Sequence, residues 1–322
     1  MKTEIHLVYA MHRPETLEDT RTLMQRCDTL ILEEPELDSF LPMLEKTTPV
    51  ETYLQESETE YPEYGKRQCA ILQQLHAQGK SILQVEPYLQ VLVGIHEFFG
   101  AGHSPAEIDK DSLRSQVYDS EREATGKLID FYRSLTDSSF SDVINTVMQF
   151  AKADSNRIRL RDSLRADALI KKIPHNEVVF IEAGPIHRSL EKILRASASL
   201  SSALISTRFL DDRAAESSGF PESLLSPGDE YTLALVFGED ISEATSRLLC
   251  AQALIYNKLI TKEELTDTIL TYPHIHEEQR VIRTVRALEY KQCEQIFELV
   301  RFANTEKSRK IVANYVQEST HN

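Results

Sequence analysis

The sequence lacks the features that mark several common classes of protein. It contains four cysteines, Cys27, Cys69, Cys250 and Cys293, and no Cys-x-x-Cys pair, which argues against a zinc ribbon or a dithiol site. No apolar run approaches the ~20 residues that a membrane-spanning helix needs. The first residues also lack the basic and apolar regions of a signal peptide. These absences predict a cytoplasmic protein with reduced thiols and no membrane partner.

Basic residues are also in deficit, and the usual nucleotide motifs are missing. The chain has 36 Lys and Arg against 51 Asp and Glu, which gives a formal net charge of −15. An excess of negative charge argues against nucleic acid or an anionic membrane as the main partner. Neither a Walker loop nor a Gly-x-Gly-x-x-Gly motif occurs. With 322 residues, 41% of them hydrophobic, the chain can build one large α/β domain or two smaller ones.

Short apolar runs followed by turns and helical patterns are what the sequence does contain. Four such runs cover residues 5–10, 29–32, 82–85 and 178–181. Strands that alternate with helices are typical of a parallel sheet, so we predict an α/β fold with a mostly parallel sheet flanked by helices. A fifth strand is expected within residues 200–209. The pattern leaves residues 229–237 ambiguous between strand and helix.

The remaining segments suggest how the chain is organised. We expect the first half of the α/β core in residues 1–100 and the second half in residues 157–240. Between them, residues 101–156 have a helical pattern and are predicted to form a cap over the site. Residues 241–322 are predicted to be a helical C-terminal region that packs on the sheet domain or on a second copy of the chain, which would form a homo-oligomer. Residues 36–63 suggest a short helix and a solvated acidic loop.

Polar residues follow the predicted strands at their carboxyl ends. His12 and His187 come after the first and last of the four runs, and Glu33 and Glu86 come after the two others. In open α/β sheets, ligands bind in the crevice outside these ends, so the four side chains are expected to share one site. Either Glu33 or Glu34 can be the carboxylate that faces it.

A stripe of arginines leads into the last of these strands. Arg157, Arg161 and Arg165 are spaced at i, i+4 and i+8 and therefore lie on one face of a helix. The stripe is either a solvated basic face or a means of aiming the Arg161 guanidinium at the site. A guanidinium there suits an anionic substrate oxygen or orients a carboxylate.

The order of these motifs resembles the TraB/TIKI/ChaN/erythromycin-esterase superfamily over roughly residues 4–200. The matching segments are Tyr9-Ala10-Met11-His12, Leu32-Glu33, Arg161-Asp162 and Ala183-Gly184-Pro185-Ile186-His187. The resemblance implies site roles for His12, Glu33, Arg161 and His187, and position alone adds Glu86. Tyr9 stands where the superfamily has Gly, and Leu160 stands where it has Glu before Arg-Asp.

The resemblance implies a hydrolase of peptidase or esterase type that acts on a small molecule or a peptide. In one mechanism His12, Glu33 and His187 bind a divalent ion (Mn, Fe, Co or Zn) that activates a water molecule. In the other no metal takes part, and Glu33 or Glu86 orients a histidine that acts as general base. The alternative from another class is a non-catalytic small-ligand-binding or regulatory protein that uses the same crevice.

Overall fold

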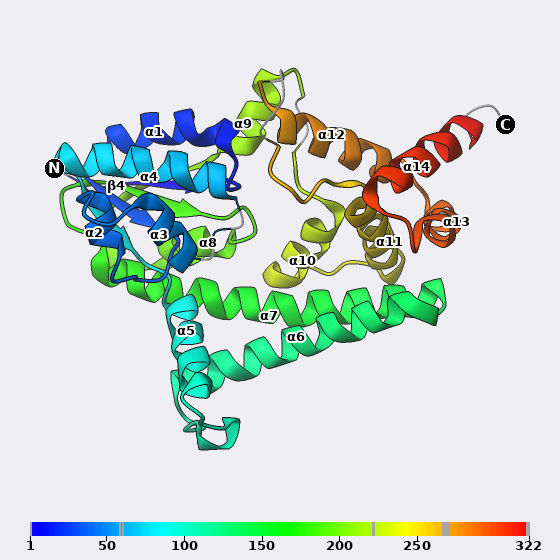
Figure 1. The fold of residues 1–322 in the computed structure, drawn as a ribbon, viewed down its shortest axis with the longest axis horizontal. Coiled ribbons are helices and arrows are strands. Elements are labelled where there is room, and N and C mark those ends of the chain that lie inside the picture. The colour runs from blue at the N-terminus through cyan, green and yellow to red at the C-terminus, as the bar shows by residue number, and fades with distance from the viewer. Residues whose placement is uncertain (1, 58, 60, 221–222, 266–270, 320–322) are drawn as a thin grey trace. The chain divides into compact units, whose positions relative to one another are not determined.

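The fold is described from a computed structural model, which covers residues 2–57, 59, 61–220, 223–265 and 271–319 (Figure 1). The chain divides into two compact units, which are described separately. Unit 1 comprises Met1–Tyr118, Arg159–Pro221 and Glu263–Pro273. Unit 2 comprises Asp119–Ile158, Glu222–Lys262 and His274–Asn322.

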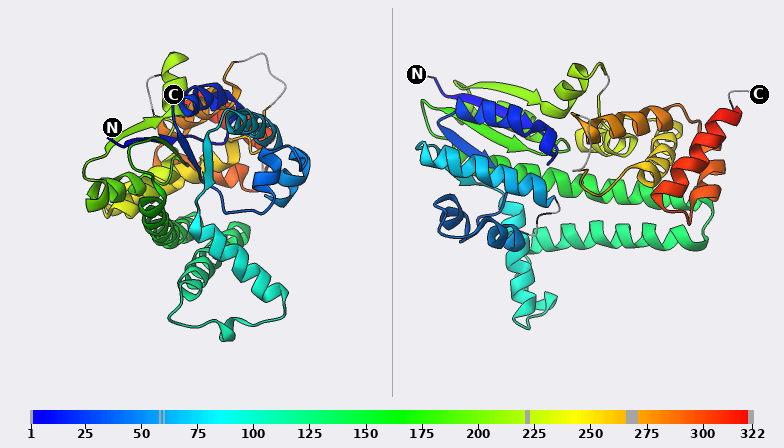
Figure 2. Two further views of the ribbon diagram at one scale, coloured as in Figure 1. Left: turned by 90° about the vertical axis from the view of Figure 1, so that its left-hand side faces the viewer. Right: turned by 45° about the horizontal axis from the view of Figure 1, so that its top comes forward.

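Unit 1 is built on one five-stranded parallel sheet (Figure 2). The strands are β1 (Glu4–Tyr9), β2 (Thr29–Leu32), β3 (Ser81–Gln84), β4 (Val178–Ala183) and β5 (Leu204–Phe209), in the order β3-β2-β4-β1-β5. The predicted α/β fold is therefore confirmed. All four apolar runs are strands of this sheet, and the fifth strand lies within the expected residues.

The sheet is covered by helices on both faces, which explains why its central strands are apolar at successive positions. On one face Val8, Leu30 and Leu32 pack against α1 (Leu17–Gln25), α2 (Phe40–Leu44), α3 (Val50–Glu56) and α4 (Pro62–Ala77). On the other, Leu7 and Ile31 pack against α8 (Ser189–Ala196) and the last turns of α7 (Phe140–Lys172). Each fully buried aliphatic side chain contributes about 1.5–3 kcal/mol to the hydrophobic stabilisation of this core.

The topology of the sheet selects the carboxyl end of β4 as the place for a site. The helices that follow β1 and β2 pack on one face, whereas the helix that follows β4 packs on the other. β4 lies between β2 and β1 in the sheet. The chain therefore leaves β4 toward one face and leaves both neighbouring strands toward the other face. Such divergence opens a crevice outside the carboxyl ends of parallel strands.

Several helices depart from the sequence prediction. Residues 36–63 contain α2, α3 and the first residues of α4, so this segment holds more helix than the predicted short helix and acidic loop. The other elements of unit 1 are α5 (Pro87–Gly100), α9 (Leu210–Ser217) and the 3-10 turns η1 (Pro14–Thr16), η2 (Pro105–Glu107) and η3 (Ala198–Leu200).

The helical segment after α5 forms two long helices, α6 (Leu113–Asp137) and α7 (Phe140–Lys172). The expected boundary near residue 157 lies inside α7, close to the division between the two units at residues 158 and 159. No Gly or Pro occurs between Phe140 and Lys172, so nothing in the backbone chemistry ends the helix there. No helix in the described part of the chain is long and apolar enough to cross a membrane.

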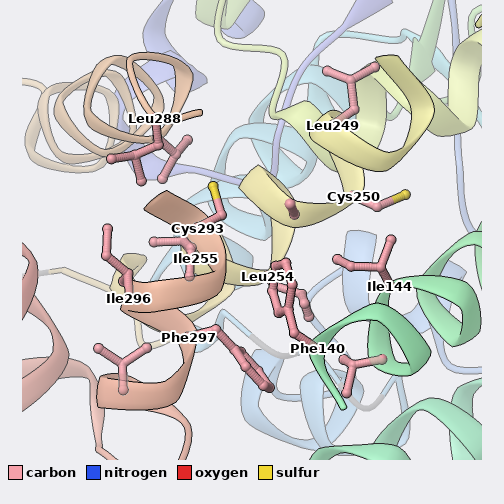
Figure 3. Close-up of a cluster of buried hydrophobic side chains, with 14 of the residues drawn as sticks. Phe140, Ile144, Leu249, Cys250, Leu254, Ile255, Leu288, Cys293, Ile296 and Phe297 are labelled. Carbon is pink, nitrogen blue, oxygen red and sulfur yellow. The ribbon is translucent and has the colours of Figure 1, made fainter. Parts of the chain in front are cut away.

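Unit 2 is a helical bundle around its own apolar core (Figure 3). It contains α10 (Pro227–Phe237), α11 (Glu243–Leu259), α12 (Pro273–Arg286), α13 (Tyr290–Val300) and α14 (Thr305–Ser319) with parts of α6 and α7. The ambiguous segment 229–237 is helical. Its ends explain why: Ser226 caps the first turn through its Oγ, Pro227 opens the helix, and Gly238 ends it in the left-handed region at φ 68°.

The four cysteines are all free and buried. Cys27 and Cys69 lie in unit 1, and Cys250 and Cys293 lie in unit 2. Burial raises the pKa of each thiol to about 12. In the folded protein these side chains therefore behave as small apolar groups.

Candidate functional site

Glu33 is the centre of a buried group of charges at the carboxyl ends of β2 and β4. Its Oε2 accepts a hydrogen bond from the Gly184 backbone N–H at 2.5 Å. Its Oε1 lies 3.1 Å from Arg161 Nη2, 3.3 Å from Arg165 Nη1 and 3.3 Å from His187 Nε2. Burial alone would raise the pKa of Glu33, but Arg165, His187 and Arg161 outweigh it and hold the pKa at about 2. Glu33 is therefore a carboxylate throughout the physiological range.

His187 lies between two carboxylates. Its Nδ1 is 2.5 Å from Asp162 Oδ1, and its Nε2 faces Glu33. The Ser189 hydroxyl donates a second hydrogen bond to Asp162. The Gly-Pro turn holds the backbone of His187 in place, because the His187 N–H donates to the Gly184 carbonyl at 3.0 Å. His187 and Asp162 are both buried, so solvent does not compete for the contact between them.

Glu86 and the two arginines complete the group. The Glu86 carboxylate lies 3.3 Å from Arg161 Nε and 3.6 Å from Arg165 Nε, and its side chain is fully buried. Burial raises the pKa of Glu86 despite both arginines. Arg165 also donates to the backbone carbonyls of Val85 at 3.0 Å and Glu182 at 2.6 Å. It therefore ties the end of β4 to the residue that follows β3.

The three arginines of the stripe do not all contact the same residues. Arg161 lies at the site, as expected, and Arg165 lies there with it. Arg157 pairs instead with Glu121 at 3.3 Å and with Asp154 at 2.5 Å. Arg161 faces two carboxylates of the protein, Glu33 and Glu86.

A cavity of about 680 Å³ opens beside Glu33. Its lining includes His12, Glu33 and Glu34 from the strand ends and Tyr53, Tyr64 and Gln68 from α3 and α4. It also includes His96 and Glu97 from α5, Glu56, and apolar residues such as Leu72, Leu89 and Leu92. The volume suits a small molecule.

Both adjacent glutamates line this cavity, but their environments differ. Glu34 accepts hydrogen bonds from the Tyr53 hydroxyl at 2.7 Å and from Gln84 Nε2 at 2.8 Å. These partners are neutral, whereas those of Glu33 include two guanidinium groups. Of the two, Glu33 is the glutamate that both lines the cavity and contacts the buried arginines.

His12 lies at the cavity wall and is exposed. Its ring stacks on that of Tyr64, with 5.1 Å between centroids and 15° between planes. The structure therefore brings Glu33, Glu86, Arg161 and His187 together in direct contact. His12 shares the cavity lining with Glu33, whereas His187 is not among the lining residues.

Sequence reasoning missed Glu182 on β4, which contacts Gln68 in the lining of the cavity. It accepts a hydrogen bond from Gln68 Nε2 at 3.2 Å and one from the Glu33 N–H at 3.3 Å. Burial raises the pKa of Glu182, and the charge of nearby His12 opposes this rise. A charged residue inside an otherwise apolar strand was the available signal. Asp162 was missed as well, although it directly follows Arg161 in the motif.

The predicted metal ligands His12, Glu33 and His187 are not arranged as a ligand set. Among the described residues, no group of three or more His, Cys, Asp or Glu side chains could hold a metal ion. The chemistry of the donors agrees, because the Glu33 oxygens already face Arg161, Arg165 and a backbone N–H. Two guanidinium groups at this distance would repel a cation. The residues present therefore do not fit a resident metal.

Comparison with known proteins gives one relative. The chain is 31% identical over 298 residues to an uncharacterized protein of Archaeoglobus fulgidus. The aligned residues make up 91% of this chain and 97% of that protein. The two belong to one family. No protein-family model matches the chain. No solved structure matches it either. The motif resemblance to the TraB/TIKI superfamily stays a prediction.

The ionised state of Glu33 predicts how stability depends on pH. A carboxyl with a folded pKa of about 2, against an ordinary value of 4.5, stabilises the fold above pH 4.5. That contribution is lost as the pH falls toward 2. We expect the difference in unfolding free energy between wild type and Glu33→Gln to shrink by roughly 2 kcal/mol from pH 6 to pH 3. Urea unfolding at each pH measures it, and a constant difference would contradict the assignment.

Proposed function

We propose that the protein is a hydrolase that binds a small substrate in the cavity of unit 1 and uses His12 as general base. The observation that supports this most directly is that His12 and Glu33, from the ends of β1 and β2, line one cavity. Glu33 is held ionised there by buried cations. A cavity with a histidine and a fixed carboxylate contains the groups needed to activate water.

The roles of the two residues follow from their environments. A carboxylate with a pKa of about 2 is too weak a base to remove a proton from water near neutral pH. Glu33 instead accepts a hydrogen bond from the water and orients it. His12, which is exposed in the same cavity, takes the proton as the water attacks the substrate carbonyl. His12 then returns the proton to the leaving group, as general base catalysis of hydrolysis requires.

His187 and Asp162 act as positioning residues in this proposal. They do not line the cavity, but the His187 ring lies between Asp162 and Glu33 and fixes the Glu33 carboxylate. Arg161 contributes in the same way, because it is engaged with Glu33 and Glu86.

The lining of the cavity also favours one charge on the substrate. It includes Glu33, Glu34, Glu56 and Glu97 and no Lys or Arg within the part of the chain that the structure describes. The charge of Glu33 is met by Arg161 and Arg165, but Glu34, Glu56 and Glu97 would repel an anionic substrate. We therefore favour a neutral or cationic ester or amide.

Three acetate esters of similar size test the proposal. The alcohol part is choline, 3,3-dimethylbutanol or 3-hydroxypropanoate, which is cationic, neutral or anionic, and acid release is followed in a pH-stat. We expect kcat/KM for the choline ester to exceed that for the anionic ester by about tenfold or more. Because no metal has a role in the proposal, dialysis against a chelator should leave the rates unchanged.

The other outcomes are equally informative. Binding of the cationic ester without hydrolysis would replace the hydrolase proposal with the non-catalytic ligand-binding alternative. Hydrolysis that disappears on chelation and returns with one added metal would restore the metal-dependent mechanism. Preference for the anionic ester would overturn the charge argument.

A further inference from the structure

We propose that unit 2 contains a second binding site, which takes an elongated apolar molecule that carries a single carboxylate. Its basis is a cavity of about 650 Å³ in the helical bundle. Every described residue that lines it belongs to unit 2, so the site is separate from the proposed hydrolase cavity. The volume lies within the range of small-molecule sites.

The walls of this cavity are mainly apolar and aromatic. Phe131 and Tyr132 come from α6, Phe150 comes from α7, and Leu254 and Phe297 come from α11 and α13. Leu254 and Phe297 also belong to the core of the bundle (Figure 3). Tyr132 is 57% exposed, so the wall presents apolar surface to solvent that a ligand would cover. Covering such surface is favourable by about 25 cal/mol per Å².

Two lysines in the lining supply positive charge. Lys258 Nζ donates hydrogen bonds to the backbone carbonyls of Arg301 at 2.7 Å and Ala303 at 3.4 Å. Lys262 also lines the cavity and is exposed. Within the described residues neither lysine is paired with a carboxylate. Burial lowers the pKa of Lys258, and the charge of the neighbouring Lys262 lowers it further, so the two ammonium groups are close enough to interact.

The two carboxylates of the lining have partners of their own. Asp154 lies 2.5 Å from Arg157 Nη2. Asp229 Oδ2 accepts a hydrogen bond from the Ser226 hydroxyl at 2.7 Å. Neither is therefore the counterion of the lysines, and a bound anion would serve as one.

The start of α14 adds to the positive potential. Asn304 and Thr305 line the cavity, and Lys258 donates to the carbonyl of the adjacent Ala303. The amino end of a helix carries a partial positive charge, which stabilises an anion near it. No arginine lines the cavity among the described residues, and most of the lining is apolar. A single carboxylate on an apolar body therefore fits better than a phosphate or a polyanion.

Isothermal titration of the full-length protein with three molecules of equal chain length tests the proposal. We expect dodecanoate, below its micelle concentration, to bind at least about tenfold more tightly than dodecanol or dodecylammonium. Equal affinity for dodecanoate and dodecanol would show that the lysines do not recognise the head group. Tighter binding of dodecylammonium would overturn the proposal. This comparison depends on no variant.

Variants then locate the site. Lys262→Gln should weaken dodecanoate binding by about five- to tenfold without changing dodecanol binding, because it removes charge alone. Lys307→Gln, an exposed lysine of α14 outside the lining, is the matched control and should bind as wild type does. Tyr132→Ser should weaken both ligands, and because Tyr132 is exposed the unfolding free energy should change little. Loss of binding in the control, or none in Lys262→Gln, would place the ligand elsewhere.

Discussion

Replacing Arg165 by leucine is expected to lower the unfolding free energy by about 3–5 kcal/mol, the largest effect that we predict for stability. Arg165 is 1% exposed and holds two backbone carbonyls and two carboxylates. Leucine fills part of the space but donates no hydrogen bond, so the carbonyls of Val85 and Glu182 lose a donor and Glu33 loses a counterion. Buried groups left without partners are costly. Urea unfolding at pH 7 measures the change.

Two further variants separate this explanation from simple loss of packing. Arg161→Leu removes ion pairs to the same two carboxylates, but the Arg161 side chain is 23% exposed, so water can replace part of what is lost. Its cost should therefore be smaller than that of Arg165→Leu. Adding Glu86→Gln to Arg165→Leu should recover part of the loss, because it removes one of the two carboxylates that then depend on Arg161. A double variant less stable than Arg165→Leu would contradict this account.

Replacing His12 by asparagine is expected to lower kcat on the best ester by about 10²–10⁴-fold, the range that general base catalysis contributes. Asparagine retains a polar side chain of similar reach but cannot take up a proton. His12 is exposed, so the unfolding free energy should change little. Initial rates at saturating substrate, with thermal unfolding of the same samples, measure both effects.

His96 provides a matched control for this experiment. It is also an exposed histidine in the lining of the same cavity, but it lies on α5 rather than at a strand end. His96→Asn should keep kcat near the wild-type value. If His96→Asn abolishes turnover and His12→Asn does not, the general base has been assigned to the wrong histidine.

The strands could be predicted because their residues report burial directly. Leu30, Ile31 and Leu32 are apolar at consecutive positions, and a short strand covered on both faces buries all three. The place of Glu33 followed from the same pattern, since parallel strands end at one edge. The continuity of α7 was harder to predict, because its first half packs in the core of unit 2 and its last turns pack on the sheet of unit 1.

The details of the site depended on contacts that are distant in the sequence. The loop of His12 is fixed by Asp211, whose Oδ2 accepts a hydrogen bond from the Met11 N–H at 2.7 Å across 200 positions. No local pattern contains that contact. Glu182 could not be assigned for a related reason. The pleat of β4 fixes the face to which its side chain points, but only the tertiary structure shows that Gln68 donates a hydrogen bond to it there.

Each unit contains two of the four buried cysteines, and their thiols can report when that unit opens to solvent. A thiol with a pKa of about 12 that is shielded from solvent reacts with an aqueous reagent only while its surroundings are transiently open. Cys27 and Cys69 therefore record exposure of the sheet unit, and Cys250 and Cys293 record exposure of the helical bundle. Their rates of modification under native conditions report whether the two units open together or independently, without any label being engineered into the chain.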